Sequence, residues 1–151
     1  MEVFQAGLED LEAVAEVFDH YRVFYKASSD LEGAREFIRE RMQNCDSVIF
    51  AARHDGCIVG LTQLYPSFSS VSMRRIWILN DLFVDLSYRK QGVATLLMQA
   101  AKDFATETKA LQLELATHHT NTTAQSLYAT LGYVKDEAFY YYALSLEGED
   151  L

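Results

Sequence analysis

Apolar residues recur at helical spacing in two stretches near the start of the chain. They occupy one face from Leu8 to about Tyr25, and again from about Leu31 to Gln43. Between these stretches, Ser28-Ser29-Asp30 supplies a break and a capping residue for the second helix. Before them, alternation from Met1 to Ala6 predicts a short strand. The chain is therefore expected to begin with a strand and two helices.

A hairpin is expected next. The apolar stretch from Ser47 to Arg53 predicts a strand, and Asp55-Gly56 is a tight-turn dipeptide that leads into a return strand from Cys57 to Tyr65. Pro66 is expected to end that strand. The serine-rich segment from Ser67 to Ser72 then reads as a loop or as the frayed start of the following strand.

The strand expected from Arg75 to Val84 carries an anomaly in its pattern. Trp77 and Leu79 share one parity, whereas Leu82 and Val84 share the other. A strand shifts its buried face by one residue only at a bulge, or when both of its faces are buried. A bulge at this position would splay the strand from its neighbour and open backbone groups to a ligand. The pattern leaves both explanations open.

Strands and helices alternate through the second half. A helix is expected to open at Arg89-Lys90-Gln91-Gly92-Val93-Ala94 and to continue to about Thr108. A strand from Leu111 to Thr117 follows, and then a helix from Asn121 to Leu131 that Gly132 ends. Tyr133-Val134 and Ala138 to Leu146 are expected to be the last, paired strands. The fold class is α/β of the α+β type, with a central mixed, mostly antiparallel sheet of about six to seven strands flanked by about four helices.

Composition narrows the class of protein. The 151 residues, of which 50% are hydrophobic, fit a single domain over 1–151. The start of the chain lacks the pattern of an export signal, so a cytoplasmic location with reduced, buried Cys45 and Cys57 is expected. No apolar run reaches the length of a membrane span. The net charge of −9 argues against nucleic acid as a partner and is compatible with a cationic substrate.

Arg89-x-x-Gly92-x-Ala94 follows a strand and opens a helix, which is the context that an anion site requires. The first N–H groups of a helix lack internal partners, and the helix dipole makes this end partly positive. Small residues at 92 and 94 would let a pyrophosphate approach the backbone. The alternative is a plain turn glycine beside a solvated Arg89-Lys90 pair. The pattern is neither a P-loop nor a dinucleotide fingerprint.

The segments around this motif resemble the GNAT superfamily of N-acetyltransferases, and the resemblance covers nearly the whole chain. It implies an enzyme that moves an acetyl group from acetyl-CoA to a primary amine of a polyamine-like small molecule or of a protein, by direct attack on the thioester. No metal is expected. The matching residues are Asn80-Asp81-Leu82-Phe83-Val84, Tyr88-Arg89-Lys90-Gln91-Gly92-Val93-Ala94 with Leu96-Leu97, and Asn121, Ala124, Leu127-Tyr128 and Leu131-Gly132-Tyr133.

The resemblance also implies roles for individual residues. The backbone of Leu82 would face the thioester carbonyl, where an N–H stabilises developing charge. Val84 would pair with the pantetheine arm, which Asn121 would also meet. Tyr128 would be the general acid for the departing sulfur. The residues expected to bind the donor are Leu82, Phe83, Val84, Arg89, Lys90, Gln91, Gly92, Val93, Ala94, Thr95, Asn121 and Ala124.

The general base is left open by the sequence. Ile78 stands where certain family members carry a carboxylate, and the parity of Asp81 is expected to turn it away from the acceptor. One alternative is a water relayed by Asn80, or a backbone carbonyl. The other is a base from the first two helices. The candidates there are Asp30, Glu32 and His20, each of which also fits a cap or a solvated charge.

Three further features concern partners. Tyr21, Phe24, Tyr25 and the acidic region from Asp30 to Glu32 are expected to shape an acceptor site for a cationic amine. The run Phe139 to Tyr142 favours a homodimer. His118-His119 has no third ligand, so a surface position is expected rather than a metal site. A non-catalytic acyl-CoA sensor or assembly module is the alternative function, and the presence of Tyr128 favours the enzyme.

Overall fold

The computed structural model describes residues 1–147 in two compact units. One is Met1–Ala116 and the other begins at Thr117, and each is described by itself. The last four positions of the expected domain, 148–151, lie outside the described residues. Within 1–147, none of the helices combines the length and the apolarity that crossing a membrane requires.

A mixed sheet organises the first unit, as the sequence predicted. Its described strands lie in chain order, with antiparallel pairing up to β4 and a parallel pairing between β4 and β5. The sheet has five strands, so the expectation of six to seven was wrong. The strands are β1 (Glu2–Gln5), β2 (Val48–His54), β3 (Cys57–Ser69), β4 (Arg74–Val84) and β5 (Leu113–Glu114).

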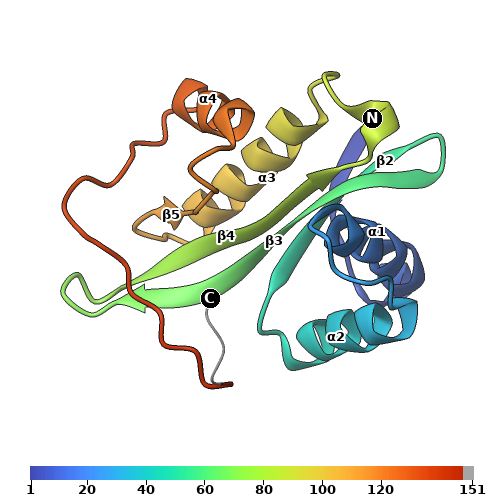
Figure 1. Cartoon of the computed structure of the whole chain (residues 1–151), viewed down its shortest axis with the longest axis horizontal. Helices are drawn as coiled ribbons and strands as arrows, with labels where there is room; N and C mark the ends of the chain where they lie inside the picture. The colour runs from blue at the N-terminus through green and yellow to red at the C-terminus, as the bar shows by residue number, and fades with distance from the viewer. Residues whose placement is uncertain (148–151) are drawn as a thin grey trace. The chain divides into compact units, whose positions relative to one another are not determined.

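Helices cover both faces of this sheet (Figure 1). The helices α1 (Leu11–Phe24) and α2 (Leu31–Asn44) lie on one face and α3 (Val93–Glu107) on the other, while α4 (Thr122–Thr130) belongs to the second unit. Short 3-10 turns precede α1 and follow β4, at Leu8–Asp10 (η1) and Leu86–Tyr88 (η2). The core between α1, α2 and the sheet contains Leu11, Val14, Val17, Phe18, Ala34, Ile38, Ile49, Ala51, Ile58, Leu61 and Phe83.

The missing strands are those expected at the end of the chain. Tyr133-Val134 and the segment from Ala138 to Leu146 form no ladder among the described residues, and β5 is limited to two residues. Aromatic and apolar residues favour a strand, but a strand exists only where a partner supplies its hydrogen bonds. The side chains from Phe139 to Tyr142 are correspondingly exposed.

Strand β3 was expected to end at Pro66, but it continues to Ser69. Pairing with β2 stops at Leu64, and beyond this point β3 pairs with β4 alone, with Pro66 opposite Trp77. Proline cannot donate to a ladder and is tolerated where one side of the strand is unpaired. This extension is therefore compatible with the proline.

The hairpin between β2 and β3 forms as predicted. Asp55 and Gly56 take positive φ angles of 49° and 79°, and His54 pairs with Cys57 across the turn. Both cysteines are exposed, so the expectation that they are buried was wrong. Cys57 begins the strand that leaves the turn, and Cys45 takes a left-handed conformation at the end of α2. Positions at turns and helix ends are surface positions, which explains their exposure.

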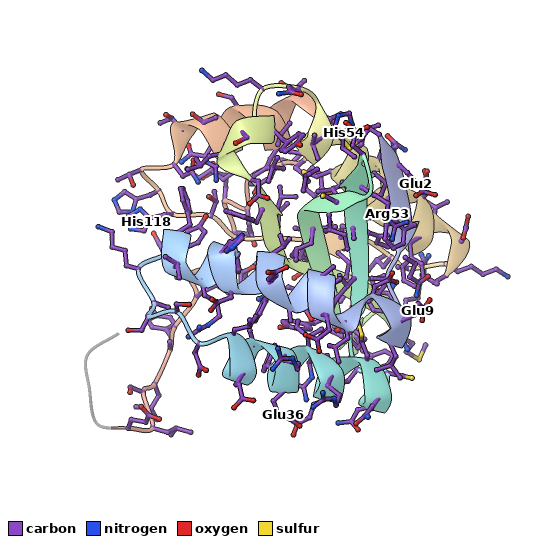
Figure 2. All side chains as sticks on the ribbon, turned by 90° about the vertical axis from the view of Figure 1, so that its right-hand side faces the viewer. Glu2, Glu9, Glu36, Arg53, His54 and His118 are labelled. Atoms are coloured by element: carbon purple, nitrogen blue, oxygen red, sulfur yellow. The ribbon has the colours of Figure 1, made fainter. Side chains whose placement is uncertain are left out.

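The β1 edge of the sheet is occupied by charged side chains, and Figure 2 shows Glu2 and Arg53 there. Arg53 Nη1 lies 3.1 Å from Glu2 Oε1, and the guanidinium lies 4.2 Å from the ring centroid of Phe4. Arg53 Nη2 also lies 3.5 Å from Asp10 Oδ1. These side chains contact one another. On the other side of the sheet, part of β4 has backbone N–H and C=O groups without a ladder partner among the described residues.

Candidate active site

A bulge interrupts β4 at Asn80. Gln63 of β3 pairs with Asp81, and the next residue, Leu64, pairs with Leu79, so Asn80 is the extra residue. Of the two explanations that the parity shift left open, the structure shows the bulge. The side chain of Asn80 is exposed.

The bulge also explains the shift in the pattern. Trp77, before the bulge, packs against Phe104 of α3 at 5.1 Å between ring centroids. Val84, after it, meets Leu97 of α3 over Gly60, where each lies 3.4 Å from the position that a glycine Cβ would take. Both residues face α3 although their parities differ, because the extra residue resets the alternation.

The outer edge of β4 is unpaired beyond the bulge. Strand β5 pairs with β4 only at Trp77 and Ile78, and within residues 1–147 no other strand joins that side. The backbone from Leu79 to Val84 therefore has N–H and C=O groups on this side without a ladder partner. A strand edge of this kind can hydrogen-bond an extended ligand.

The loop after β4 forms a cradle of backbone amides at the start of α3. Lys90 and Gly92 take positive φ angles of 61° and 83°, and the first helical hydrogen bond runs from Leu96 N to Gly92 O at 3.1 Å. No side chain among the described residues caps this helix end. A Cβ at Gly92 would meet nothing within 4 Å, so the space at this position is open. The cradle fits a pyrophosphate, since these N–H groups need an acceptor.

Arg89 is held against the protein by three contacts. Its Nε donates a hydrogen bond to Val84 O at 2.9 Å, and its guanidinium lies 4.5 Å from the ring centroid of Phe24 and 5.6 Å from that of Phe83. Arg89 therefore ties the loop to the end of β4 and to the end of α1. Lys90 is exposed and carries the free positive charge of the loop. The side chain of Phe83 lies in the core, and Phe83 pairs with Leu61 of β3.

A buried polar cluster lies under the bulge, on the side of α1. Asp81 is 6% exposed, and its carboxylate accepts hydrogen bonds from Gln63 Nε2 at 2.8 Å and from Asn80 Nδ2 at 3.2 Å. Burial, the charge of Asp81 and a hydrogen bond to it raise the pKa of Tyr21. Burial and the charge of Asp81 raise the pKa of Tyr65 to about 12. Asp81 thus lies toward Tyr21, an expected acceptor residue, and not away from it.

Gln63 and Tyr65 were not singled out by the sequence analysis. The available signal was a glutamine in the apolar stretch from Ile58 to Leu64, since a polar side chain in a buried strand needs a partner. The partner is recognisable only once the register of β3 and β4 is known.

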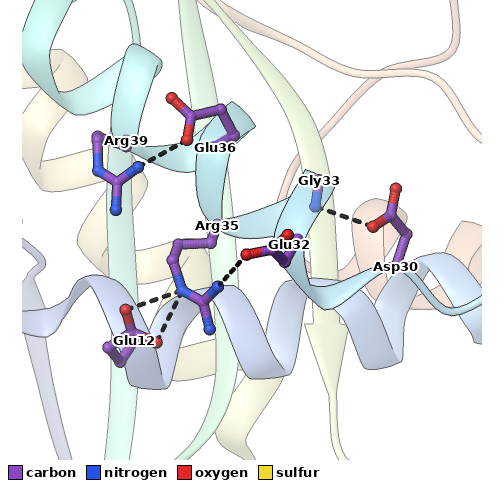
Figure 3. Close-up of polar contacts among 7 residues, drawn as sticks. All are labelled: Glu12, Asp30, Glu32, Gly33, Arg35, Glu36 and Arg39. Carbon is purple, nitrogen blue, oxygen red and sulfur yellow. Dashed lines mark hydrogen bonds and ion pairs between the residues drawn. The ribbon is translucent and has the colours of Figure 1, made fainter.

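The base candidates of the first two helices serve other purposes. Asp30 Oδ1 accepts a hydrogen bond from Gly33 N at 2.9 Å and caps α2, and Glu32 is 95% exposed beside Arg35 (Figure 3). The ring of His20 is exposed and lies 3.7 Å from Asp85. Asp30 is thus a helix cap, and the side chains of Glu32 and His20 are exposed.

The second unit contains the remaining predicted residues. Asn121 Oδ1 accepts a hydrogen bond from Ala124 N at 3.1 Å and caps α4. Tyr128 packs against Tyr133 with 6.0 Å between ring centroids, and burial, followed by the neighbouring Tyr128, raises the pKa of Tyr133. Gly132 takes a φ of 93° directly after α4, as predicted. The rings of His118 and His119 stack at 4.6 Å. Residues 1–147 contain no group of three side chains that could hold a metal ion.

Comparison with known proteins gives a consistent result. The model of the acetyltransferase (GNAT) family matches residues 14–133. The uncharacterized N-acetyltransferase YhfO of Bacillus subtilis is 47% identical over 97% of this chain and 98% of its own length. A thialysine N-epsilon-acetyltransferase of Bos taurus is 34% identical over 62% of this chain and 55% of its own.

A solved structure agrees with these relatives. The crystal structure of a probable acetyltransferase superimposes with a TM-score of 0.93 at 41% identity, covering 99% of this chain and 100% of the other. The match to the family extends over most of the chain and includes β4, the amide cradle and α4. The chain therefore belongs to the GNAT acetyltransferase family and is an acyltransferase of the N-acetyltransferase type.

Proposed function

We propose that this enzyme transfers the acetyl group of acetyl-CoA to the primary amine of a small cationic molecule or of a peptide. The observation that carries the proposal is the amide cradle from Lys90 to Thr95 beside the unpaired edge of β4. The cradle suits a pyrophosphate and the edge suits an extended amide-bearing arm, and the donor contains both. Acetyl-CoA supplies the acetyl group as a thioester, so that an amine forms a new C–N bond as the C–S bond breaks.

The first unit would bind and orient the donor. The amides of Lys90, Gln91, Gly92, Val93, Ala94 and Thr95 would hold the phosphates, with Lys90 adding charge. The backbone of Val84 would face the pantetheine arm, and the N–H of Leu82 would donate to the oxygen that gains negative charge during the reaction. Arg89 supports this assignment because it fixes the loop to β4.

The second unit would supply the proton for the leaving group. Tyr128 is proposed as the general acid that protonates the departing sulfur, and Asn121 and Ala124 as residues at the pantetheine arm. The hydrogen bond that Asn121 makes as the cap of α4 uses its side-chain oxygen, so the side-chain nitrogen can still donate. Asn80 is proposed to orient the water that takes a proton from the amine.

Several observations support a cationic acceptor. The net charge of −9 favours the approach of positively charged molecules. Tyr21, Phe24 and Tyr25 form an aromatic cluster at the end of α1. The ring centroid of Tyr25 lies 5.2 Å from that of Tyr21 and 5.2 Å from that of Phe24. One relative is named for acetylating thialysine, a lysine-like amine.

The test is release of free CoA from acetyl-CoA in the presence of polyamines, lysine peptides and aminoglycosides. We expect turnover with at least one cationic amine. Tyr128→Phe keeps the ring packing against Tyr133 and removes the proposed proton donor, so it should lower kcat about 100-fold or more. Turnover that is unchanged in this variant would exclude Tyr128 as the acid, and no acetyl transfer to any amine would contradict the proposed acceptor class.

A further inference from the structure

Asp81 is a buried carboxylate without a cationic partner. It is 6% exposed, and its hydrogen bonds come from neutral groups, the side-chain amides of Gln63 and Asn80 and the phenol of Tyr21. Among the described residues, no Lys, Arg or His side chain lies within ion-pair distance of it. Burying a carboxylate is costly unless it is paired, so a charge left in this condition calls for a partner that the chain itself does not provide.

A second buried acceptor lies beside it. Gln63 is 0% exposed, and while its Nε2 donates to Asp81, its Oε1 has no hydrogen-bond partner. Flipping the amide would not help, because the oxygen would then face the carboxylate. Unsatisfied buried acceptors are rare and usually mark a missing donor. The two residues together lack a positive charge and an N–H group.

The cluster is closed by side chains that reach the surface. Tyr21 and Tyr65 are half-buried, and Asn80 at the bulge is exposed. The phenols remain neutral, since burial and the charge of Asp81 raise the pKa of both. Phenol oxygens can accept further N–H groups. A cation that reaches Asp81 from solvent would therefore pass beside neutral oxygen acceptors next to the open edge of β4.

We propose that Asp81, with the side-chain oxygen of Gln63 and the phenols of Tyr21 and Tyr65, forms the subsite for an ammonium group of the acceptor. An ammonium carries one positive charge and three N–H donors, which is what the cluster lacks. This inference rests on the proposed function and narrows it to acceptors that present an alkylammonium group. It makes Asp81 a binding residue for the substrate and leaves the donor half untouched.

A role of Asp81 in binding and a role in stability predict different effects of its replacement on the unfolding temperature. A carboxylate retained for stability should destabilise the protein when it is replaced. In Asp81→Asn, the amide oxygen can still accept the hydrogen bond from Gln63 and the uncompensated charge is removed. We therefore expect the unfolding temperature of D81N to equal or exceed that of the wild type, as for residues kept for function at a cost in stability.

The experiment is calorimetric titration of the full chain in the presence of CoA with putrescine and with a lysine-containing peptide, using butanediol as the neutral counterpart. The wild type should bind the two ammonium compounds and not the diol. D81N should weaken their binding about 30-fold or more, because one partner of a buried charge pair is lost. Tyr21→Phe should weaken it less, since only one phenol is removed.

The control variant is Asp55→Asn, which removes one negative charge at an exposed turn position where the left-handed conformation suits asparagine. It should bind as the wild type does. Unchanged binding in D81N, a lowered unfolding temperature of D81N, or a wild type that binds CoA but neither ammonium compound would each overturn the subsite. Failure of the wild type to bind acetyl-CoA would instead overturn the proposed function.

Discussion

Asp19 and Asp81 are both carboxylates that are only 6% exposed, yet their surroundings differ. Asp19 accepts hydrogen bonds from Ser29 Oγ at 2.6 Å and from Asp30 N at 2.8 Å, with the guanidinium of Arg22 3.4 Å away. These partners tie α1 to the start of α2. Asp81 has neutral partners only. Their partners therefore distinguish Asp19, which stabilises the fold, from Asp81, which is proposed to bind a ligand.

Asp19 predicts a dependence of stability on pH. Its pKa is lowered from 3.8, chiefly by the hydrogen bond from Asp30 N and then by that from Ser29. A carboxyl with a lowered pKa in the folded state stabilises the protein above its unfolded-state pKa and loses this contribution as the pH falls through the folded-state pKa. The contribution is therefore complete near neutral pH and is lost below the unfolded-state value of 3.8.

The measurement is urea unfolding of Asp19→Asn and the wild type over a pH series. At neutral pH the variant should be less stable by about 1–3 kcal/mol, since charged acceptors make stronger hydrogen bonds. The difference should shrink in acid, where the wild-type carboxyl is also neutral. A difference that stays constant from neutral pH to about pH 2 would contradict this role.

Gly92 opens α3 with a positive φ angle. Alanine at 92 would strain a φ of 83° and place a Cβ in the open space at this position. We expect weaker acetyl-CoA binding, by about tenfold, together with a stability loss of roughly 1–2 kcal/mol. Gly56→Ala is the matched control, because Gly56 has a φ of 79° and equally open surroundings.

The Gly56 variant should lose similar stability and keep its affinity for acetyl-CoA, measured by titration calorimetry. Equal affinities of the Gly92 and Gly56 variants would show that the space over Gly92 is not used by the donor.

Among the elements, α3 depends on close approach to the sheet. Phe104 packs against both Phe50 of β2 and Trp77 of β4, and Trp77 Nε1 donates to Thr108 Oγ1 at 2.9 Å just past the end of the helix. At the other end, Gly60 of β3 lies under Leu97. This packing sets the height of the helix N-terminus, and so of the amide cradle, above the end of β4.

Gly60→Ala tests that packing. The new Cβ would lie 2.9 Å from Phe83 O and 3.4 Å from Leu97 Cδ1. A backbone carbonyl cannot move aside as a flexible side chain can, so we expect a stability loss of about 1–3 kcal/mol, as for other overpacked cores. Thermal unfolding measures it. An unchanged unfolding temperature would mean that α3 does not depend on this contact.

The sequence predicted those features of the fold that local chemistry determines. Asp55-Gly56 makes its turn because these residue types accept positive φ, and Asn80 forms the bulge that was one of two explanations for the parity shift. Gly92 likewise sits at the start of its helix with a positive φ. Each feature depends on a few adjacent residues.

Features that depend on distant partners were predicted less well. The segment from Ala138 to Leu146 is rich in the aromatic residues that strands favour, but sequence alone cannot provide the strand that would pair with it. The hydrogen bond of Arg89 to Val84 O and its contact with the ring of Phe24 were not predicted, because the second requires the end of α1 to lie nearby. The cluster of Asp81 and Gln63 likewise depends on the register of two strands.

Acetyl-CoA is proposed to bind with its phosphates on the amides that open α3 and its arm along β4. The test is a titration of the isotopically labelled chain with acetyl-CoA, followed by amide resonances. The largest shifts are expected at the amides from Lys90 to Thr95, with further shifts at Leu82 and Val84. Saturable binding whose shifts cluster elsewhere, such as the β1–β2 edge around Glu2 and Arg53, and leave Lys90 to Thr95 unmoved, would contradict it.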